Sequence, residues 1–184
     1  MFIIKNNYYF YIDNTKSINL NLIKRNINVT IIYRNNSEAE SITRIIKFRK
    51  KLKARKFKFY IANNLKLAKK CKADGMYISS YNKKLYKNIT VIGSAHNLRE
   101  INQKIKQGCK NIILSRLFKT NYLGKESFYG PIKFNLIAQK YTINLIPLGG
   151  INNENLLKLN LLTSNAFSSL SEIKKKPGIS TRLF

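Results

Sequence analysis

Short runs of apolar residues recur along the chain, and polar stretches with helical spacing follow most of them. The runs are rich in β-branched and aromatic residues and nearly continuous in apolar character. Both features are typical of parallel strands covered on both faces. The pattern predicts eight strands, at residues 8–13, 29–33, 57–62, 75–78, 90–94, 111–114, 144–148 and 166–169.

Helix signals lie between these runs. The sequence Ser-Glu-Ala-Glu at 37–40 matches a capping box, which predicts a helix from Ser37 to about Arg55. Its apolar face should contain Ile42, Ile45, Ile46 and Leu52. Helical spacing also predicts helices over 97–107, 132–140 and 152–161. The first of them, with Leu98, Ile101 and Ile105 on its apolar face, should end at Gly108.

Eight strand-then-helix units in one domain predict a (β/α)8 barrel. A chain of 184 residues is short for this fold, so we expect only helical stubs after the first, fourth and eighth strands. The alternative is an open doubly wound parallel sheet with fewer strands. Because no Pro, Gly or Ser-rich linker divides the chain, we expect a single domain over 1–184 that ends in a basic tail at 174–184.

The composition adds a large positive charge. Lysine and arginine number 35 against 8 acidic residues, which gives a net charge of +27. Taken alone, this charge predicts a protein that binds nucleic acid or an anionic surface. The cations are spread over the whole chain, however, and the abundant Asn, Ile, Tyr and Phe are residues that an AT-rich genome supplies regardless of function. We therefore favour compositional drift, and expect small anionic substrates to be attracted in either case.

Several classes of protein are excluded by simple counts. No apolar run reaches the roughly 18 residues that a membrane span needs. The N-terminus lacks the charged region and the cleavage site of a signal peptide. Two cysteines, Cys71 and Cys109, are too few for a disulfide framework. We therefore expect a cytoplasmic protein that does not bind membranes.

Candidate site residues follow the predicted strands, where a barrel of this kind presents its ligand-binding groups. Gly149 and Gly150 let the backbone approach a ligand closely, and Asn152 is the expected N-cap of the next helix. Together with residues 169–171 they predict a phosphate site, with an ordinary tight turn as the alternative.

His96 is the single histidine and follows the fifth strand beside Ser94. It is a candidate acid or base that could face the mouth of the barrel, and a structural or solvated histidine is the alternative. One histidine and two distant cysteines give no zinc-binding spacing. None of the eight acidic residues is spaced as a paired acid–base site.

Five motifs in order resemble those of the thiamine-phosphate synthases and the related thiazole tautomerases (TenI-like proteins). They are Tyr-Ile-Asp at 11–13, Ile-Ala-Asn-Asn-Leu-Lys-Leu-Ala at 61–68 with Ala-Asp-Gly-Met-Tyr-Ile at 73–78, Ile-Gly-Ser-Ala-His at 92–96, Leu-Phe-Lys-Thr at 117–120 and Pro-Leu-Gly-Gly-Ile-Asn at 147–152. The resemblance covers nearly the whole chain, and the fold of the family is a (β/α)8 barrel, in agreement with the strand count.

The resemblance implies an activity and a set of site residues. The synthase joins a pyrimidine diphosphate to a thiazole phosphate and releases diphosphate, with magnesium holding the leaving group. By motif, Arg34 would hold the diphosphate, and Ser94 and Thr120 would contact the phosphorylated groups. The thiazole phosphate would lie against Gly149, Gly150, Leu170 and Ser171.

The chain departs from the family where the metal would bind. The two magnesium aspartates of the family fall at Asn63 and Asn82. Magnesium prefers anionic oxygen ligands, so the loss of both carboxylates should weaken its binding sharply. Without the metal, the departing diphosphate would need cationic help, for which Arg34, Arg116 and Lys119 are candidates.

Three hypotheses remain open from the sequence. The first, which the order of the motifs slightly favours, is a diverged thiamine-phosphate synthase. The second is a thiazole tautomerase, whose proton shift needs no metal and would use His96 as acid and base. The third is a non-catalytic protein that binds phosphorylated ligands or RNA.

Overall fold

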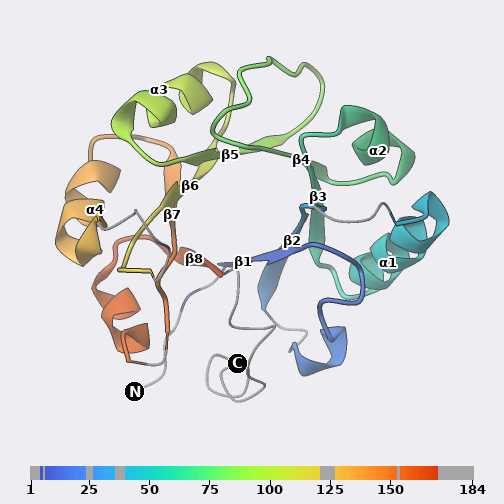
Figure 1. Cartoon of the computed structure of the whole chain (residues 1–184), viewed down its shortest axis with the longest axis horizontal. Helices are drawn as coiled ribbons and strands as arrows, with labels where there is room; N and C mark the ends of the chain where they lie inside the picture. The colour runs from blue at the N-terminus through green and yellow to red at the C-terminus, as the bar shows by residue number, and fades with distance from the viewer. Residues whose placement is uncertain are drawn as a thin grey trace.

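The computed structural model is a closed barrel of eight parallel strands with helices around it (Figure 1). The structure describes residues 5, 7–23, 27–35, 40–120, 127–152 and 154–169. Each strand pairs in parallel with the next, and the last pairs with the first, placing Phe167 opposite Tyr8. The predicted (β/α)8 barrel is therefore confirmed. The open doubly wound sheet is wrong, because hydrogen bonds between the eighth and first strands join the two sheet edges.

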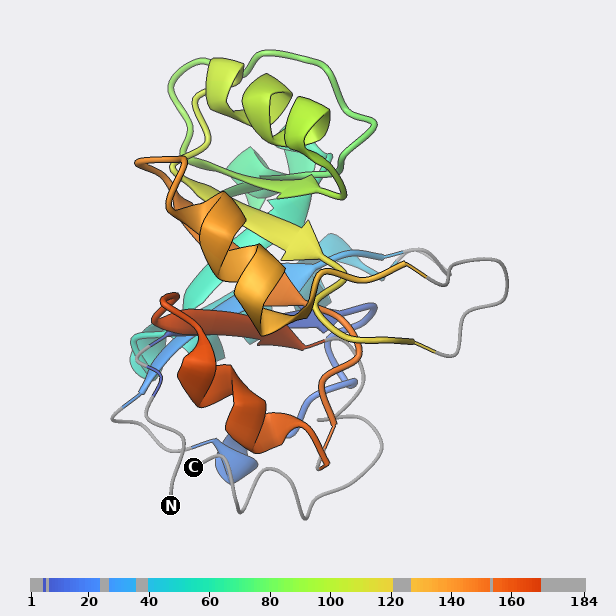
Figure 2. The ribbon, with the colours of Figure 1, turned by 90° about the vertical axis from the view of Figure 1, so that its left-hand side faces the viewer.

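The strands match the predicted apolar runs to within one residue at each end. They are β1 Asn7–Ile12, β2 Asn28–Tyr33, β3 Lys58–Ala62, β4 Gly75–Ile78, β5 Val91–Ala95, β6 Asn111–Ser115, β7 Asn144–Leu148 and β8 Ala166–Ser169. Figure 2 shows the strands from the side, running in the same direction.

Successive side chains of each strand alternate between the barrel interior and the outer core. On β1, Tyr9 and Tyr11 belong to the interior cluster, whereas Tyr8, Phe10 and Ile12 belong to the core shared with the helices. The interior cluster consists of Tyr9, Tyr11, Ile32, Tyr60, Tyr77, Ile92, Ile113, Ile146, Leu148 and Ala166. Because both faces are buried, the strands are mostly apolar, and polar residues such as Thr30, Ser94 and Ser168 are exceptions.

The helices that surround the barrel are short, and some connections contain none. They are α1 Ile42–Ala54, α2 Leu65–Lys70, α3 Leu98–Lys106 and α4 Gly130–Ala138, with the 3-10 helices η1 Leu20–Leu22 and η2 Leu156–Leu161. Residues 79–90, between β4 and β5, contain no helix. Short connections of this kind let a small chain close an eight-stranded barrel. Among the described residues, no helix has the length and apolar character to cross a membrane.

The stubs that we expected after three of the strands have different outcomes. After β1 the stub is the three-residue helix η1. After β4 no helix forms, so the prediction of a stub there is wrong. Residues after β8 lie outside the described part of the chain, as does the predicted basic tail at 174–184.

The predicted start of the first long helix is wrong. Helix α1 begins at Ile42 with Ser41 as its N-cap, and residues 37–39 lie outside the described part of the chain. Glu40 lies before the helix, and its carboxylate accepts hydrogen bonds from the Thr15 amide and hydroxyl, both at 2.8 Å. The Glu40 carboxylate, which the local sequence predicts to cap the helix, thus joins two loops instead.

Two further helix predictions need correction. Asn152 is not a helix N-cap: its side chain accepts from the amides of Glu154 and Asn155 in a turn, and the next helix is the 3-10 helix η2. On α3, Ile101 is buried as expected, but Leu98 is 43% exposed and Ile105 36% exposed. Lys104 is fully buried instead. Ile42 of α1 also faces solvent.

The segment after β6 passes directly over the end of β7. Gly149 and Gly150 have φ values of +99° and +69°. A Cβ atom on Gly150 would lie 2.4 Å from the carbonyl oxygens of both Phe118 and Lys119. The Phe118 amide donates to the Gly149 carbonyl at 3.0 Å, which joins the two segments. Glycine is therefore required at 150 by the approach of one backbone to another.

Replacing Gly150 should separate this steric effect from the cost of a positive φ. Gly108 is a matched control, because its φ is +81° and a Cβ there would meet nothing within 4 Å. We expect Gly108→Ala to lower the free energy of unfolding by about 1 kcal/mol, and Gly150→Ala to lower it by about 3 kcal/mol or more. Urea unfolding of the two variants measures the difference. Equal losses would contradict the close approach.

Candidate functional site

A cavity of about 850 Å³ lies at the C-terminal ends of the strands. This is the end at which a (β/α)8 barrel presents ligand-binding groups. Its walls come from the ends of the strands, the loops that follow them and the first turn of α4. The lining residues are Tyr11, Arg34, Tyr77, Ser79, Ser80, Tyr81, Ser94, His96, Ser115, Arg116, Thr120, Ser127, Phe128, Tyr129, Lys133, Leu148 and Gly149.

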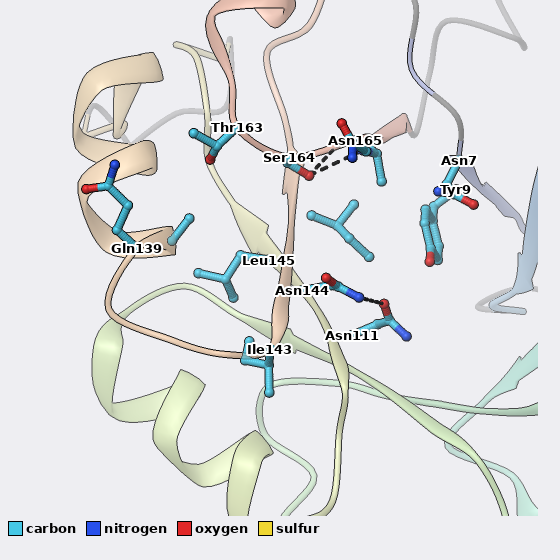
Figure 3. A pocket seen from close by; sticks show the side chains of 13 residues that line it. Asn7, Tyr9, Asn111, Gln139, Ile143, Asn144, Leu145, Thr163, Ser164 and Asn165 are labelled. Carbon is cyan, nitrogen blue, oxygen red and sulfur yellow. Dashed lines mark hydrogen bonds between the residues drawn. The ribbon is translucent and has the colours of Figure 1, made fainter.

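A second cavity, of about 450 Å³, lies at the opposite end of the barrel. Figure 3 shows its amide, hydroxyl and aliphatic side chains, with Asn144 donating to Asn111 at 3.2 Å. None of the described residues that line it carries a charge. It therefore offers no cation for phosphate, and Tyr9 is its only described side chain that can exchange a proton. Of these two cavities at the ends of the barrel, the one at the C-terminal end is the candidate site.

Three cationic side chains line the candidate site. They are Arg34 after β2, Arg116 after β6 and Lys133 in α4. The Arg116 guanidinium donates to Thr120 Oγ1 at 3.1 Å. Lys133 Nζ lies 5.7 Å from the centre of the Tyr129 ring, a cation–π contact. Since no described lining residue is Asp or Glu, the cavity is positively charged and suits an anionic ligand.

His96 is held at the rim of the cavity by the first turn of α3. Its amide donates to Glu100 Oε2 at 2.8 Å, and its Nδ1 lies 3.0 Å from the same oxygen. The Asn97 side chain in turn caps the Glu100 amide at 2.9 Å, and the Tyr129 hydroxyl donates to the His96 carbonyl at 2.5 Å. A carboxylate on one ring nitrogen orients the imidazole and leaves the other nitrogen for proton transfer.

Tyr11 lines the cavity from inside the barrel. Its ring packs edge-on against Tyr77, with ring centres 5.3 Å apart. Its hydroxyl is buried and has no hydrogen-bond partner among the described residues. Burial, together with the neighbouring Tyr77 hydroxyl, raises the pKa of the Tyr11 hydroxyl well above its ordinary value, so the group stays protonated. The Tyr77 hydroxyl is nearby but not in hydrogen-bonding geometry with it. A buried donor without a partner is costly unless a ligand satisfies it.

The two positions where the resemblance implies magnesium ligands hydrogen-bond to each other. Asn82 Nδ2 donates to Asn63 Oδ1 at 3.0 Å, and the same oxygen accepts from the Ser79 amide at 3.0 Å. Asn63 Nδ2 donates to Ser79 Oγ at 2.7 Å, while Asn82 Oδ1 accepts from the Lys84 amide at 3.0 Å. Neither side chain lines the cavity.

These residues do not fit a magnesium ion. Amide oxygens bring no charge to offset the dehydration of the ion, and both oxygens already accept hydrogen bonds from the protein. Among the described residues, no cluster of three or more His, Cys, Asp or Glu side chains is placed to hold a metal.

The structure brings most of the predicted site residues together. The cavity is lined by Arg34, Ser94, His96, Thr120 and Gly149. Gly150 does not line it and instead lies beneath the segment after β6. Lys119 is exposed and also does not line it. Leu170 and Ser171 lie outside the described residues, so the predicted phosphate cradle remains a prediction.

Sequence reasoning missed several lining groups. Tyr11 could have been found from the strand period, because alternation along β1 places it on the interior face next to the mouth. Lys133 and Tyr129 follow a segment outside the regular pattern, and nothing in their spacing indicated that α4 would turn them toward the cavity.

Comparison with known proteins shows similarity to thiamine-phosphate synthases. The family model described as thiamine monophosphate synthase matches residues 3–173. A thiamine-phosphate synthase from Prochlorococcus marinus subsp. pastoris is 27% identical over 169 residues, which is 85% of this chain and 48% of that protein. The chain thus spans about half the length of this curated relative.

Solved structures share the fold at low sequence identity. Thiamine phosphate pyrophosphorylase from Pyrococcus furiosus superposes with a TM-score of 0.75 at 14% identity, covering 98% of this chain and 93% of that one. Phosphoribosyl anthranilate isomerase from Thermotoga maritima gives a TM-score of 0.69 at 16% identity, covering 97% and 96% of the two chains. Likeness at this level shows the barrel alone.

Two tyrosines test whether the Tyr11 hydroxyl has a partner in the protein. Tyr11→Phe removes a hydroxyl that bonds to no described residue, so the free energy of unfolding should stay the same or rise. Tyr129→Phe removes a donor bonded at 2.5 Å and should cost about 1 kcal/mol. Thermal unfolding without ligand measures both. A loss for Tyr11→Phe as large as that for Tyr129→Phe would show that Tyr11 is already satisfied.

Proposed function

Because the chain belongs to the thiamine monophosphate synthase family, we propose that it acts on phosphorylated thiazole and pyrimidine compounds in thiamine biosynthesis. The proposed reaction joins hydroxymethylpyrimidine diphosphate to thiazole phosphate and releases diphosphate. The observation that carries the proposal is that the cavity at the C-terminal ends of the strands is lined by Arg34, Arg116 and Lys133 and by no described carboxylate. Two phosphorylated substrates require such a surplus of positive charge.

The proposed chemistry depends on charge that develops on the leaving group. The thiazole nitrogen attacks the methylene carbon of the pyrimidine while the bond from that carbon to the diphosphate oxygen breaks. The electron pair of the broken bond leaves with the diphosphate. Preorganised cations beside the departing oxygen stabilise this transition state more than the ground state. Arg34, Arg116 and Lys133 supply cations for that purpose.

Hydroxyl groups complete the proposed binding surface. Thr120 accepts a hydrogen bond from Arg116, so a phosphate that contacts the hydroxyl would also meet the guanidinium. Ser94 lines the same cavity and is buried. Tyr11 offers a protonated hydroxyl from the barrel interior. These neutral groups would orient the substrates, and the cations would bind their charge.

Removing the Arg116 charge should weaken catalysis strongly. We expect Arg116→Gln to lower kcat/KM for thiamine phosphate formation by about 100-fold, the usual effect of losing one donor to a developing oxyanion. Arg99→Gln, at an exposed position of α3, should change it less than about twofold. The assay supplies both purified substrates, once with magnesium and once with EDTA. No product under either condition would rule out the synthase.

The His96–Glu100 pair favours a second candidate function, a thiazole tautomerase. Such a reaction removes a proton from one atom of the substrate and returns one to another, and needs no metal. An imidazole that a carboxylate orients at 3.0 Å can carry that proton in both directions. His96 lines the cavity, within reach of a ligand bound there.

A single substitution tests the tautomerase. His96→Asn should lower the rate of thiazole phosphate tautomerisation by at least about 100-fold, while Glu100→Gln should lower it less, because the imidazole remains. Proton exchange at the substrate, followed by NMR, measures both rates. A wild-type rate for His96→Asn would rule out His96 as the acid and base.

A further inference from the structure

The loop after β4 forms part of the wall of the candidate site. Ser79, Ser80 and Tyr81 line the cavity, yet residues 79–90 contain no helix. A loop of this length needs contacts of its own to keep one conformation. Helix α3 supplies them from one side, and the Asn63–Asn82 pair supplies them from another.

A buried lysine of α3 binds the loop directly. Lys104 has no exposed surface, and its Nζ donates to the carbonyl oxygens of Ser79 and Asn82, both at 2.7 Å. Its third partner is Gln107 Oε1 at 3.0 Å. Gly93 leaves room for the lysine stem, because a Cβ atom there would lie 2.9 Å from Lys104 Cγ.

Gln107, the C-cap residue of the same helix, reinforces this contact. Its Nε2 donates to the carbonyl oxygens of Asn82 at 3.0 Å and Lys84 at 2.7 Å. Lys104 and Gln107 together therefore bind three carbonyl groups of the loop. One of them belongs to Ser79, which itself lines the cavity.

Burial lowers the pKa of the Lys104 ammonium, and the Glu100 carboxylate acts in the opposite direction. The hydrogen-bond geometry around Lys104 is that of a charged ammonium group. Three oxygen acceptors match the three N–H donors of an ammonium, whereas a neutral amine has two. Among the described residues, no carboxylate forms an ion pair with Lys104. A positive charge thus lies one carbonyl group behind the cavity wall, without a paired negative charge in contact.

We infer that the Lys104 ammonium, together with the Asn63–Asn82 amide pair, replaces a bound metal ion at this corner of the barrel. Lys104 is a positioning residue that holds the β4 loop and adds positive charge behind it. A diphosphate group therefore binds in the cavity with no divalent cation. The inference depends on the proposed function for the identity of this anion.

Two physical effects oppose a metal at this corner. A divalent cation against the loop would be repelled by the buried ammonium behind it. The Asn63 and Asn82 amides also carry no negative charge, so they would not offset the cost of removing water from the ion. Both effects come from this chain's own residues.

Calorimetric titration of inorganic diphosphate into the full chain tests the inference. Diphosphate should bind in EDTA, and magnesium should leave the apparent Kd unchanged or raise it, because the metal competes for diphosphate in solution. Affinity that increases tenfold or more with magnesium, or binding that requires it, would overturn the inference. No binding under either condition would overturn it as well.

The diphosphate titration and the assay of thiamine phosphate formation together distinguish failure of this inference from failure of the proposed function. If diphosphate binds without metal and no thiamine phosphate forms, the metal-free site stands and the synthase does not. If product forms only when magnesium is present, the synthase stands and the inference fails.

Three variants test the part played by Lys104. Lys104→Met keeps the stem and removes the charge, and should weaken diphosphate binding by about tenfold or more. Gln107→Met weakens the hold on the same loop but keeps the charge, so it should weaken binding less. Lys106→Met removes an exposed charge from the same helix and should change the affinity less than about twofold.

Two results would count against Lys104. Wild-type affinity in Lys104→Met would exclude any role for it in binding the anion. Equal losses in Lys104→Met and Gln107→Met would show that the ammonium acts only on the conformation of the loop, which contradicts the replacement of a metal charge. If Lys104→Met does not fold, the diphosphate titration of the unaltered chain still decides whether the site needs a metal.

Discussion

Parallel hydrogen bonding between β8 and β1 closes the barrel, and the candidate site depends on that closure. The Ser168 hydroxyl strengthens the junction by donating to the Tyr9 carbonyl at 3.1 Å. Once the ring is closed, the C-terminal ends of distant strands surround one space. Arg34, His96 and Arg116, which lie far apart in the chain, then line the same cavity. An open sheet would place the first and last of the strand ends at opposite edges.

None of the acidic residues of the described chain lines the cavity. Asp74 accepts from the Phe59 amide at 2.7 Å and pairs with Arg49 at 2.8 Å. Glu40 binds the loop that carries Thr15, and Glu100 orients His96. The described lining of the cavity is left with cations and neutral hydroxyls, which explains how the site can attract anions whatever the origin of the overall charge.

Patterns along the chain were enough to place the barrel strands, because the signal is local. A strand buried on both faces must be apolar at every position, and Tyr8 to Ile12 shows this plainly. Helix ends were harder to place. The Glu40 carboxylate had the right spacing for a capping box, but Thr15, on another loop, takes it. Local spacing cannot register a competing partner that is remote in sequence.

Apolar runs that alternate with stretches of helical spacing were sufficient to predict the eight strands, their parallel arrangement and the strand ends at which site residues lie. Which groups occupy those ends depends on contacts between elements that are distant in the chain. Gly150 leaves room for the backbone of the segment after β6, and Asn82 donates a hydrogen bond to Asn63. Lys104 is buried on the helix face for which the spacing predicts aliphatic residues. The physical reason is that burial and hydrogen-bond pairing depend on neighbours across space, which hydrophobic periodicity does not encode.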